Sequence, residues 1–274
     1  MTPDSAAREP LRTIRATIRY VVKGEKAIFY PADRERSYWP PEDHEMSITD
    51  ARPLRHALSV ERNGFTILDH RSAVDDFFDQ RQVDEIYAPE IIAEAKRING
   101  AAHAFAFGPV ARSDDPNARQ GRLPSFGAHV DYGRRTIDEI TRDTLGHDAA
   151  EHWLAKRVVL MNFWRPITPV FSSPLALVDA SSVERGDLHD SEVRGGLMDA
   201  NRPPLFGYNL SYSARHRWYY LPRMQPSEVF AFKLYDSDGT RPQWTAHTAI
   251  VDPDTPAGAP PRQSIEIRTI SFID

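Results

Sequence analysis

The stretch VVLMNFW (158–164) is the first of seven short apolar segments in the C-terminal part of the chain. The others are PLALVDA (174–180), LFGYNLSY (205–212), HRWYYLP (216–222), EVFAFKLYD (228–236), WTAHTAIV (244–251) and SIEIRTISFI (264–273). Each segment has the length of a β-strand, and turn residues separate it from the next. Short strands in this number predict a β-sandwich or a β-barrel.

The residues before this series predict a few strands and all of the helices. Residues 12–22 (RTIRATIRYVV) alternate polar and apolar and predict a strand, whereas the polar, proline-rich residues 30–52 predict a long surface loop. A strand pair is expected at 57–60 and 65–68, with Asn63-Gly64 as its turn. Helices are expected at 89–97, 136–144 and 149–156, a strand at 102–107, and a polar loop at 112–122. The fold class is therefore mainly β with helices packed outside.

The composition excludes several classes of protein. The 274 residues carry a net charge of −5 and no dense run of Lys and Arg, which argues against binding to nucleic acid or an anionic membrane. The chain has no cysteine, so any metal must be held by nitrogen and oxygen ligands. We expect one domain over residues 1–274 with a flexible N-terminus at 1–11. Without an apolar signal-peptide core or an apolar run of about 18 residues, the expected location is the cytoplasm.

The pair His129-x-Asp131 is the first candidate for chemistry. Residues two apart in a strand point to the same face, so the imidazole and the carboxylate can converge on one ion. Such a pair together with a distant histidine forms the facial triad of non-haem Fe(II) oxygenases. By itself, the pair does not distinguish a metal site from a polar turn after a strand.

His247, in WTAHTAIVDP (244–253), is the candidate for the third ligand because it lies late in the strand-rich half. A histidine in an apolar strand is more often an ordinary core residue. Both interpretations stay open on the sequence.

The strand that follows carries two arginines on one polar face. Arg262, Ser264, Glu266 and Arg268 share this face, and the isoleucines between them share the other. One arginine with Ser264 can hold a carboxylate of 2-oxoglutarate through a bidentate pair. A half-solvated edge strand would show the same alternation.

Aromatic residues interleaved with arginines form a further cluster. Asn162, Trp164 and Arg165 lie in NFWRPI (162–167), and Tyr219 lies in HRWYYLP (216–222). They are candidates for the wall of a substrate pocket, as is Tyr132 after the His-x-Asp pair. Trp218 and Tyr220 are expected in the core.

Several of these segments together resemble a known family. They are AHVD (128–131), NFWRPI (162–167) with SPLALVDASSV (173–183), HRWYYLPRMQPSEVFAFKLYDSD (216–238), AHTAIVDP (246–253) and PRQSIEIR (261–268). They resemble the CmcJ-like, aspergillic-acid hydroxylase/desaturase (AsaB) family, which also includes a gibberellin desaturase. The resemblance extends over residues 15–272, and its strongest part runs from Trp164 to Arg268.

This resemblance implies an Fe(II)/2-oxoglutarate-dependent oxygenase on a double-stranded β-helix, a jelly-roll of cupin-like shape. Fe(II) would be held by His129, Asp131 and His247, and the cosubstrate 2-oxoglutarate by Arg262 and Ser264, with Arg268 as the rival arginine. The reaction would use dioxygen to hydroxylate or desaturate a small secondary metabolite.

Two other functions remain open on the sequence. A non-oxidative cupin-like isomerase or lyase would use the same three ligands without a carboxylate anchor at Arg262. A barrel that has lost its metal would bind a metabolite and would not retain iron.

Overall fold

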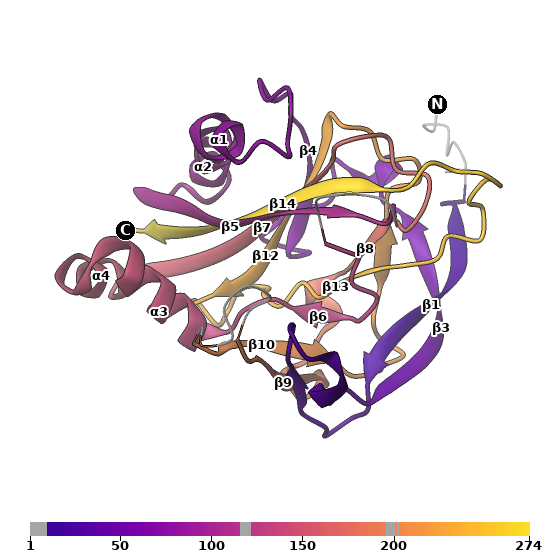
Figure 1. Cartoon of the computed structure of the whole chain (residues 1–274), viewed down its shortest axis with the longest axis horizontal. Helices are drawn as coiled ribbons and strands as arrows, with labels where there is room; N and C mark the ends of the chain where they lie inside the picture. The colour runs from indigo at the N-terminus through magenta and orange to yellow at the C-terminus, as the bar shows by residue number, and fades with distance from the viewer. Residues whose placement is uncertain (1–9, 116–121, 196–200, 202) are drawn as a thin grey trace, which may run out of the picture.

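The computed structural model describes residues 10–115, 122–195, 201 and 203–274, and within them two β-sheets face each other (Figure 1). The first sheet has nine strands in the order β1-β3-β11-β8-β13-β6-β10-β9-β2. They are β1 Thr13–Val21, β3 Pro41–Asp50, β11 Trp218–Tyr220, β8 Leu175–Val178, β13 His247–Ala249, β6 His129–Val130, β10 Leu205–Leu210, β9 Leu188–Val193 and β2 Ala27–Phe29. The second has five strands in the order β4-β12-β7-β14-β5. They are β4 Phe65–Asp69, β12 Glu228–Asp236, β7 Arg157–Pro166, β14 Gln263–Ile273 and β5 His103–Ser113.

The helices flank the two sheets. They are α1 Gln80–Gln82, α2 Ala88–Asn99, α3 Arg134–Leu145 and α4 His147–Leu154, with a π-helical turn at Val83–Tyr87 and 3₁₀ turns at Arg34–Arg36, Arg52–Leu54, Ala180–Ser182 and Arg185–Asp187. Helix α2 ends at Gly100, whose φ of +66° is the left-handed cap that the Asn99-Gly100 pair predicts. No helix in the described residues is both long enough and apolar enough to cross a bilayer.

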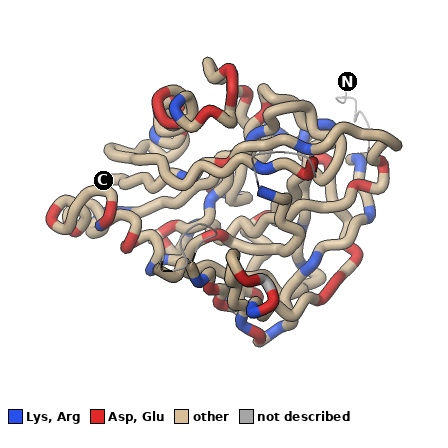
Figure 2. The backbone as a smooth tube through the Cα atoms, in the orientation of Figure 1, with Lys and Arg blue, Asp and Glu red and all other residues tan. Residues whose placement is uncertain are grey.

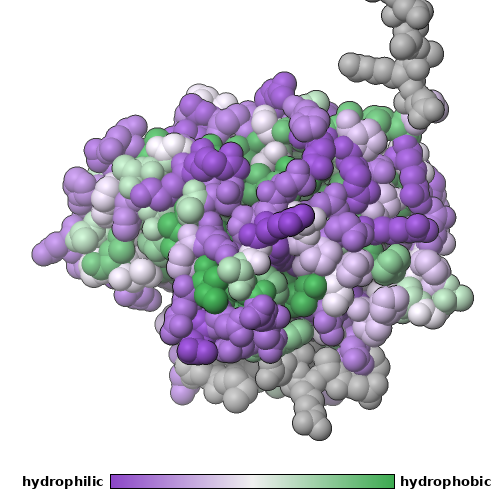
Figure 3. Space-filling view, turned by 90° about the horizontal axis from the view of Figure 1, so that it is seen from above, coloured by the Kyte–Doolittle hydropathy of each residue, from purple (hydrophilic) through white to green (hydrophobic). Residues whose placement is uncertain are grey.

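Two hydrophobic layers hold this arrangement together. The larger layer lies between the sheets, and the smaller one lies between the five-stranded sheet and α2. Alternate residues of β7 divide between them, since Trp164 packs inward and Met161 and Phe163 pack toward α2. The outside is mainly hydrophilic, with smaller hydrophobic patches, in the face that Figure 3 shows.

The prediction of a long surface loop at 30–52 is wrong, because residues 41–50 form β3. This strand pairs antiparallel with β1 from Thr13 opposite Thr49 to Val21 opposite Pro41. Ion pairs across the ladder join Arg15 to Glu45 and Arg19 to Asp43. The polar residues that suggested a loop are the solvent face of a strand.

The predicted strand pair around Asn63-Gly64 is also wrong in its first half. Residues 57–60 form turns, because their backbone groups bond locally, as in Leu58 N–H to the carbonyl of Leu54. The second half is β4, which pairs with β12. The strands β2 and β9 were not expected, whereas all seven C-terminal segments contain strands. The flexible N-terminus expected at 1–11 lies largely outside the described residues. The polar loop expected at 112–122 lies partly outside them.

Candidate metal centre

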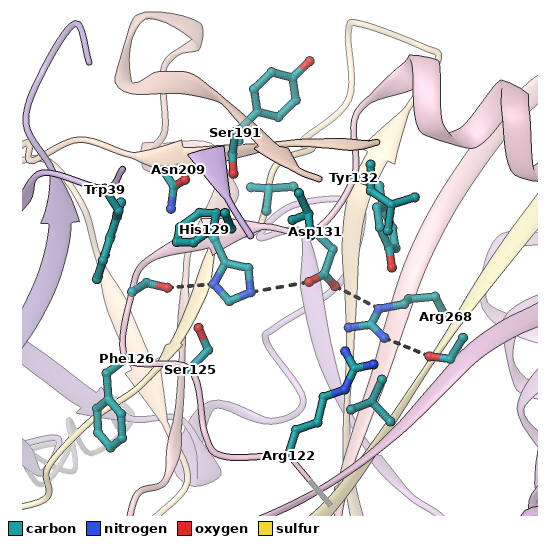
Figure 4. Close-up of a pocket in the computed structure, with 18 of the residues that line it drawn as sticks. Trp39, Arg122, Ser125, Phe126, His129, Asp131, Tyr132, Ser191, Asn209 and Arg268 are labelled. Carbon is teal, nitrogen blue, oxygen red and sulfur yellow. Dashed lines mark hydrogen bonds and ion pairs between the residues drawn. The ribbon is translucent and has the colours of Figure 1, made fainter. Parts of the chain in front are cut away.

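His129, Asp131 and His247 meet at the inner face of the nine-stranded sheet. One potential ligand atom from each lies within 4.8 Å of the others. The Oδ1 atom of Asp131 is 3.4 Å from Nε2 of His129 and 3.7 Å from Nε2 of His247. Figure 4 shows the side chains of His129 and Asp131 pointing toward one another. This cluster is the only group of its kind in the described residues.

Strand pairing brings these distant residues together. His247 in β13 is directly opposite His129 in β6, and Asn209 in β10 is opposite His129 on the other side. Strand β10 approaches this segment closely at Gly207, where an added Cβ would lie 2.4 Å from the carbonyl oxygen of Asp131. A larger residue at this position would push Asp131 away from the histidines.

Both imidazoles are arranged to offer a lone pair. Nδ1 of His129 is 2.7 Å from the carbonyl oxygen of Gly127, so Nδ1 carries the hydrogen and Nε2 is free to bind a metal. Burial, helped by the nearby His129, lowers the pKa of His247 to about 4. His247 is therefore neutral at physiological pH, which is the form that binds metals.

The second oxygen of Asp131 is held by two neighbours. Nε of Arg268 donates to Oδ2 at 3.0 Å, and Nδ2 of Asn162 donates to the same atom at 3.2 Å. Burial would raise the pKa of Asp131, but Arg268 and then the histidines outweigh it and hold this pKa well below its usual range. The carboxylate therefore stays ionised, with Oδ1 directed to the histidines.

Each of the three nitrogens of the Arg268 guanidinium donates a hydrogen bond within the fold. Besides Asp131 (Figure 4), the guanidinium donates to the carbonyl of Gly108 at 2.9 Å and to Oε1 of Glu266 at 2.7 Å. Glu266 also accepts from Arg112 at 2.8 Å, and although burial opposes it, Arg112 and Arg268 lower the pKa of Glu266 to about 2. A buried network of alternating charges therefore extends from the cluster into β14 and β5.

Arg262 is in the opposite situation. Its side chain is 1% exposed, stacks on Trp164 at 5.5 Å, and donates one recorded hydrogen bond, from Nη1 to the carbonyl of Ser173 at 2.6 Å. Within the described residues, Nε of Arg262 and Oγ of Ser264 are buried without a partner. Burial and the like charge of Arg112 lower the pKa of Arg262 to about 10. The site therefore contains a buried cation and a hydroxyl group that still lack an anion.

The donor set suits a ferrous ion. Two imidazoles and one carboxylate are the ligands of the facial triad that leaves positions open for other ligands. The cysteine-free chain offers no thiolate that would favour zinc or an iron–sulfur cluster. The partnerless atoms of Arg262 and Ser264 supply donors for a carboxylate on the same side of the fold.

Two cavities meet at this cluster. The larger holds about 500 Å³ and is lined by His129, Asp131 and Tyr132 together with aromatic and aliphatic side chains, among them Phe29, Trp39, Phe126, Val193 and Leu205. The smaller, about 10 Å³, lies between His129, His247 and Arg262. Arg112, Ser125 and His129 line both. One face of the cluster therefore opens to a large cavity with both apolar and charged walls, and the other opens to Arg262.

The remaining candidates are divided by the direction of their side chains. Tyr132 lines the large cavity, with Arg268 over its ring at 5.7 Å. Trp164 lines the small cavity beside Arg262, and Asn162 supports Asp131. Trp218 and Tyr220 are buried in the core as expected, with Nε1 of Trp218 donating to the hydroxyl of Tyr20.

Arg165 and Tyr219 require a correction, since neither lines a cavity next to the cluster. Arg165 lies on the opposite face of β7 and donates to the carbonyls of His70 and Pro226. Tyr219 packs on Phe65 in the core. Adjacent residues of a strand point to opposite faces, so Trp164 and Arg165 cannot both face the site.

Sequence reasoning missed several residues around the cluster. Gly127 orients His129, Arg112 joins the charge network, and Trp39 forms a wall of the cavity. Trp39 lies in the segment that was expected to be a surface loop. Its ring packs against Gly127, and no periodic pattern in the sequence indicates a contact between residues so far apart. Arg112 lies in a strand longer than predicted.

Comparisons with known proteins give relatives over most of the chain. The family described as "Oxidoreductase/YMDC permease-like domain" matches residues 18–272. The chain is 32% identical over 243 residues to "Fe(II)/2-oxoglutarate-dependent dioxygenase nvfI" of Aspergillus novofumigatus, covering 85% of this chain and 84% of that protein. It is 33% identical over 161 residues to "Hydroxylase/desaturase asaB" of Aspergillus flavus, covering 54% of this chain and 71% of that protein.

A solved structure has the same fold. It is described as "iron and alpha-ketoglutarate-dependent endoperoxidase NvfI", with a TM-score of 0.83 and 27% identity, covering 95% of this chain and 98% of that chain. The expected fold class, mainly β with a jelly-roll core, is thereby confirmed, as is the resemblance to the AsaB family.

Proposed function

This chain belongs to the oxidoreductase/YMDC permease-like domain family and, within it, to the Fe(II)/2-oxoglutarate-dependent dioxygenases, and on that premise we propose that it hydroxylates or desaturates a small, mainly apolar metabolite. Its cofactor is Fe(II), its cosubstrate is 2-oxoglutarate, and dioxygen is the oxidant. The observation that carries the assignment of the site is the convergence of His129, Asp131 and His247.

We propose these three residues as the iron ligands. Bound iron would supply the activation of dioxygen, coupled to oxidation of 2-oxoglutarate to succinate and carbon dioxide. Gly127 orients the ring of His129, and Arg268 with Asn162 holds Oδ2 of Asp131, so that Oδ1 faces the histidines. These contacts orient the ligands before the metal binds, which favours affinity and geometry.

We propose Arg262, with Ser264, as the anchor of the distal carboxylate of 2-oxoglutarate. The partnerless Nε of Arg262 and Oγ of Ser264 support this choice. Arg268 was the rival, but all its nitrogens already donate to Asp131, Gly108 and Glu266. Its release would leave the largely buried Asp131 without an arginine and Glu266 with Arg112 alone.

The larger cavity is the proposed place of the substrate. It adjoins His129 and Asp131, holds about 500 Å³, and is walled by apolar and aromatic side chains together with several arginines. These are the features of a small-molecule site. Tyr132 next to Asp131 would contact the substrate close to the reacting carbon.

We further propose that the whole chain, residues 1–274, is one oxygenase domain that works in the cytoplasm and binds neither nucleic acid nor membranes. The acidic net charge of −5 supports this proposal. Figure 2 adds that acidic and basic residues are intermixed along the chain, without one extended basic surface.

The test is anaerobic addition of Fe(II) and 2-oxoglutarate to the purified protein. A visible charge-transfer band of the chelate is expected, with one iron retained per chain. His129→Ala and His247→Ala should abolish iron retention, whereas the exposed His147→Ala should not, because it lies outside the cluster. Circular dichroism provides the control for folding. Iron retention without the band would favour a cupin-like isomerase or lyase, and absence of iron would favour a metabolite-binding barrel.

A further inference from the structure

Arg122 is the cation of the larger cavity that has no assigned partner. Its backbone is fixed to β5, since Arg122 N–H donates to the carbonyl of Ala111 and Ser113 N–H donates to the carbonyl of Arg122, both at 2.9 Å. Figure 4 shows its guanidinium pointing into the cavity toward Arg268. Among the described residues, no hydrogen bond or ion pair is recorded for this side chain.

The other charges of the site are balanced. Within the part of the chain that the structure describes, five arginines line the two cavities: Arg19, Arg112, Arg122, Arg262 and Arg268. Four carboxylates line them or bond to a lining arginine: Asp43, Asp114, Asp131 and Glu266. A ferrous ion and the 2-oxoglutarate dianion would cancel each other. Among the described residues, one positive charge therefore remains when iron and cosubstrate are bound.

Because the other four arginines have partners or an assigned ligand, the surplus positive charge lies on Arg122. Arg19 pairs with Asp43 at 2.7 Å at the rim, Arg112 and Arg268 share Glu266, and Arg262 is the proposed anchor of the cosubstrate. Arg122 is exposed to solvent, and the burial that it has, together with the like charges of Arg112 and Arg268, lowers its pKa. An anion beside Arg122 would relieve this repulsion.

We propose that the substrate is an anion, namely a mainly apolar molecule whose single carboxylate or sulfonate-like group binds to Arg122. This inference rests on the proposed function. Phe126, Trp39 and Val193 would cover the apolar body, since they line the same cavity. Arg122 is then a specificity residue: it contacts the acidic end of the substrate and thereby determines which carbon lies next to His129 and Asp131.

Two fluorescent probes that differ by one anionic group test the proposal. They are 8-anilinonaphthalene-1-sulfonate and the neutral N-phenyl-1-naphthylamine, titrated anaerobically into protein loaded with Fe(II) and 2-oxoglutarate. The wild type should bind the sulfonate about tenfold more tightly than the neutral probe, as expected for a charge-assisted contact. Arg122→Ala should lose this preference, and Arg122→Lys should keep most of it.

Two further variants locate the effect. Arg194→Ala also removes one exposed arginine, which pairs with Glu192 outside the cavity, and it should keep the preference. Val193→Trp fills the cavity and should weaken the binding of both probes. Preference retained in Arg122→Ala, or undiminished binding of both probes in Val193→Trp, would overturn the proposal.

The charge-transfer band of the iron–2-oxoglutarate chelate distinguishes a failure of this inference from a failure of the proposed function. If the wild type forms the band but shows no preference for the sulfonate, only the anionic substrate is wrong. If 2-oxoglutarate affinity in Arg122→Ala falls as far as in Arg262→Ala, Arg122 binds the cosubstrate and the proposal is wrong. If the wild type forms no band, the oxygenase assignment of the site fails first.

Discussion

Two buried arginines, Arg262 immediately before β14 and Arg268 in the middle of β14, are in opposite states. Arg268 is 3% exposed and donates to Asp131, Gly108 and Glu266. Arg262 is 1% exposed, and its guanidinium donates one recorded hydrogen bond, to Ser173.

This difference distinguishes an arginine that supports the fold from an arginine that binds a ligand. A buried guanidinium without a carboxylate is costly, so it persists where a ligand supplies the missing charge. A guanidinium that is fully bonded within the fold holds other residues in place instead. The comparison therefore assigns a positioning role to Arg268 and a binding role to Arg262.

Removing Arg268 should have the largest effect on stability. Arg268→Ala leaves Asp131 and Glu266 buried with less compensation, which should cost on the order of 3–5 kcal/mol of the free energy of unfolding. Urea denaturation of the metal-free protein measures this loss. Arg262→Ala in the same assay should cost much less, because it leaves no carboxylate side chain without its partner. Equal losses of the free energy of unfolding in the two variants would show that Arg268 and Arg262 do not differ in this way.

Removing Arg262 should have the largest effect on cosubstrate binding. Loss of one partner of a buried, charged pair costs on the order of 2–5 kcal/mol. At about 1.4 kcal/mol per decade, 2-oxoglutarate should bind some tens to a few thousand fold more weakly to Arg262→Ala. Iron retention should survive, since the cluster is intact. Titration of the chelate band decides, and a loss confined to Arg268→Ala would identify the other arginine as the anchor.

The charge network around Arg268 should also make the free energy of unfolding depend on pH. The pKa of Glu266 is lowered from 4.5 to about 2, so this carboxylate contributes stability above about pH 4.5 that is lost as the pH falls toward 2. The contribution is on the order of 3 kcal/mol at about 1.4 kcal/mol per pH unit. In Glu266→Gln, the metal-free protein should show a shallower decline of the free energy of unfolding across this window. An unchanged slope would mean that Glu266 has no such linkage.

The smallest effect is expected at Ser264. Its hydroxyl has no partner within the described residues, so Ser264→Ala should leave the free energy of unfolding of the metal-free protein nearly unchanged. One lost hydrogen bond to the cosubstrate is worth about 1 kcal/mol, or roughly a fivefold weaker affinity for 2-oxoglutarate. Stability and affinity falling together would show that Ser264 serves the fold.

Local periodicity accounts for what the sequence predicted correctly. Strands β1, β7, β12 and β14 alternate or are continuously apolar, and α2 ends at a glycine with positive φ, so neighbouring residues alone indicate them. The common face of Arg262, Ser264 and Arg268 follows from the same rule. The order of His129, Asp131 and His247 along the chain, in a family resemblance, indicated the cluster that the structure brings together.

Strand pairing decided what the sequence left open. It made β14 a central strand rather than an edge strand, placed β3 against β1, and directed Arg165 away from the site. It also engaged Arg268 with Asp131 across 137 residues, while the guanidinium of Arg262 found no carboxylate and only its backbone N–H donates to Asp114. A strand's alternation depends only on its own residues, whereas the partner of each buried charge depends on which distant segment the ladder brings opposite it.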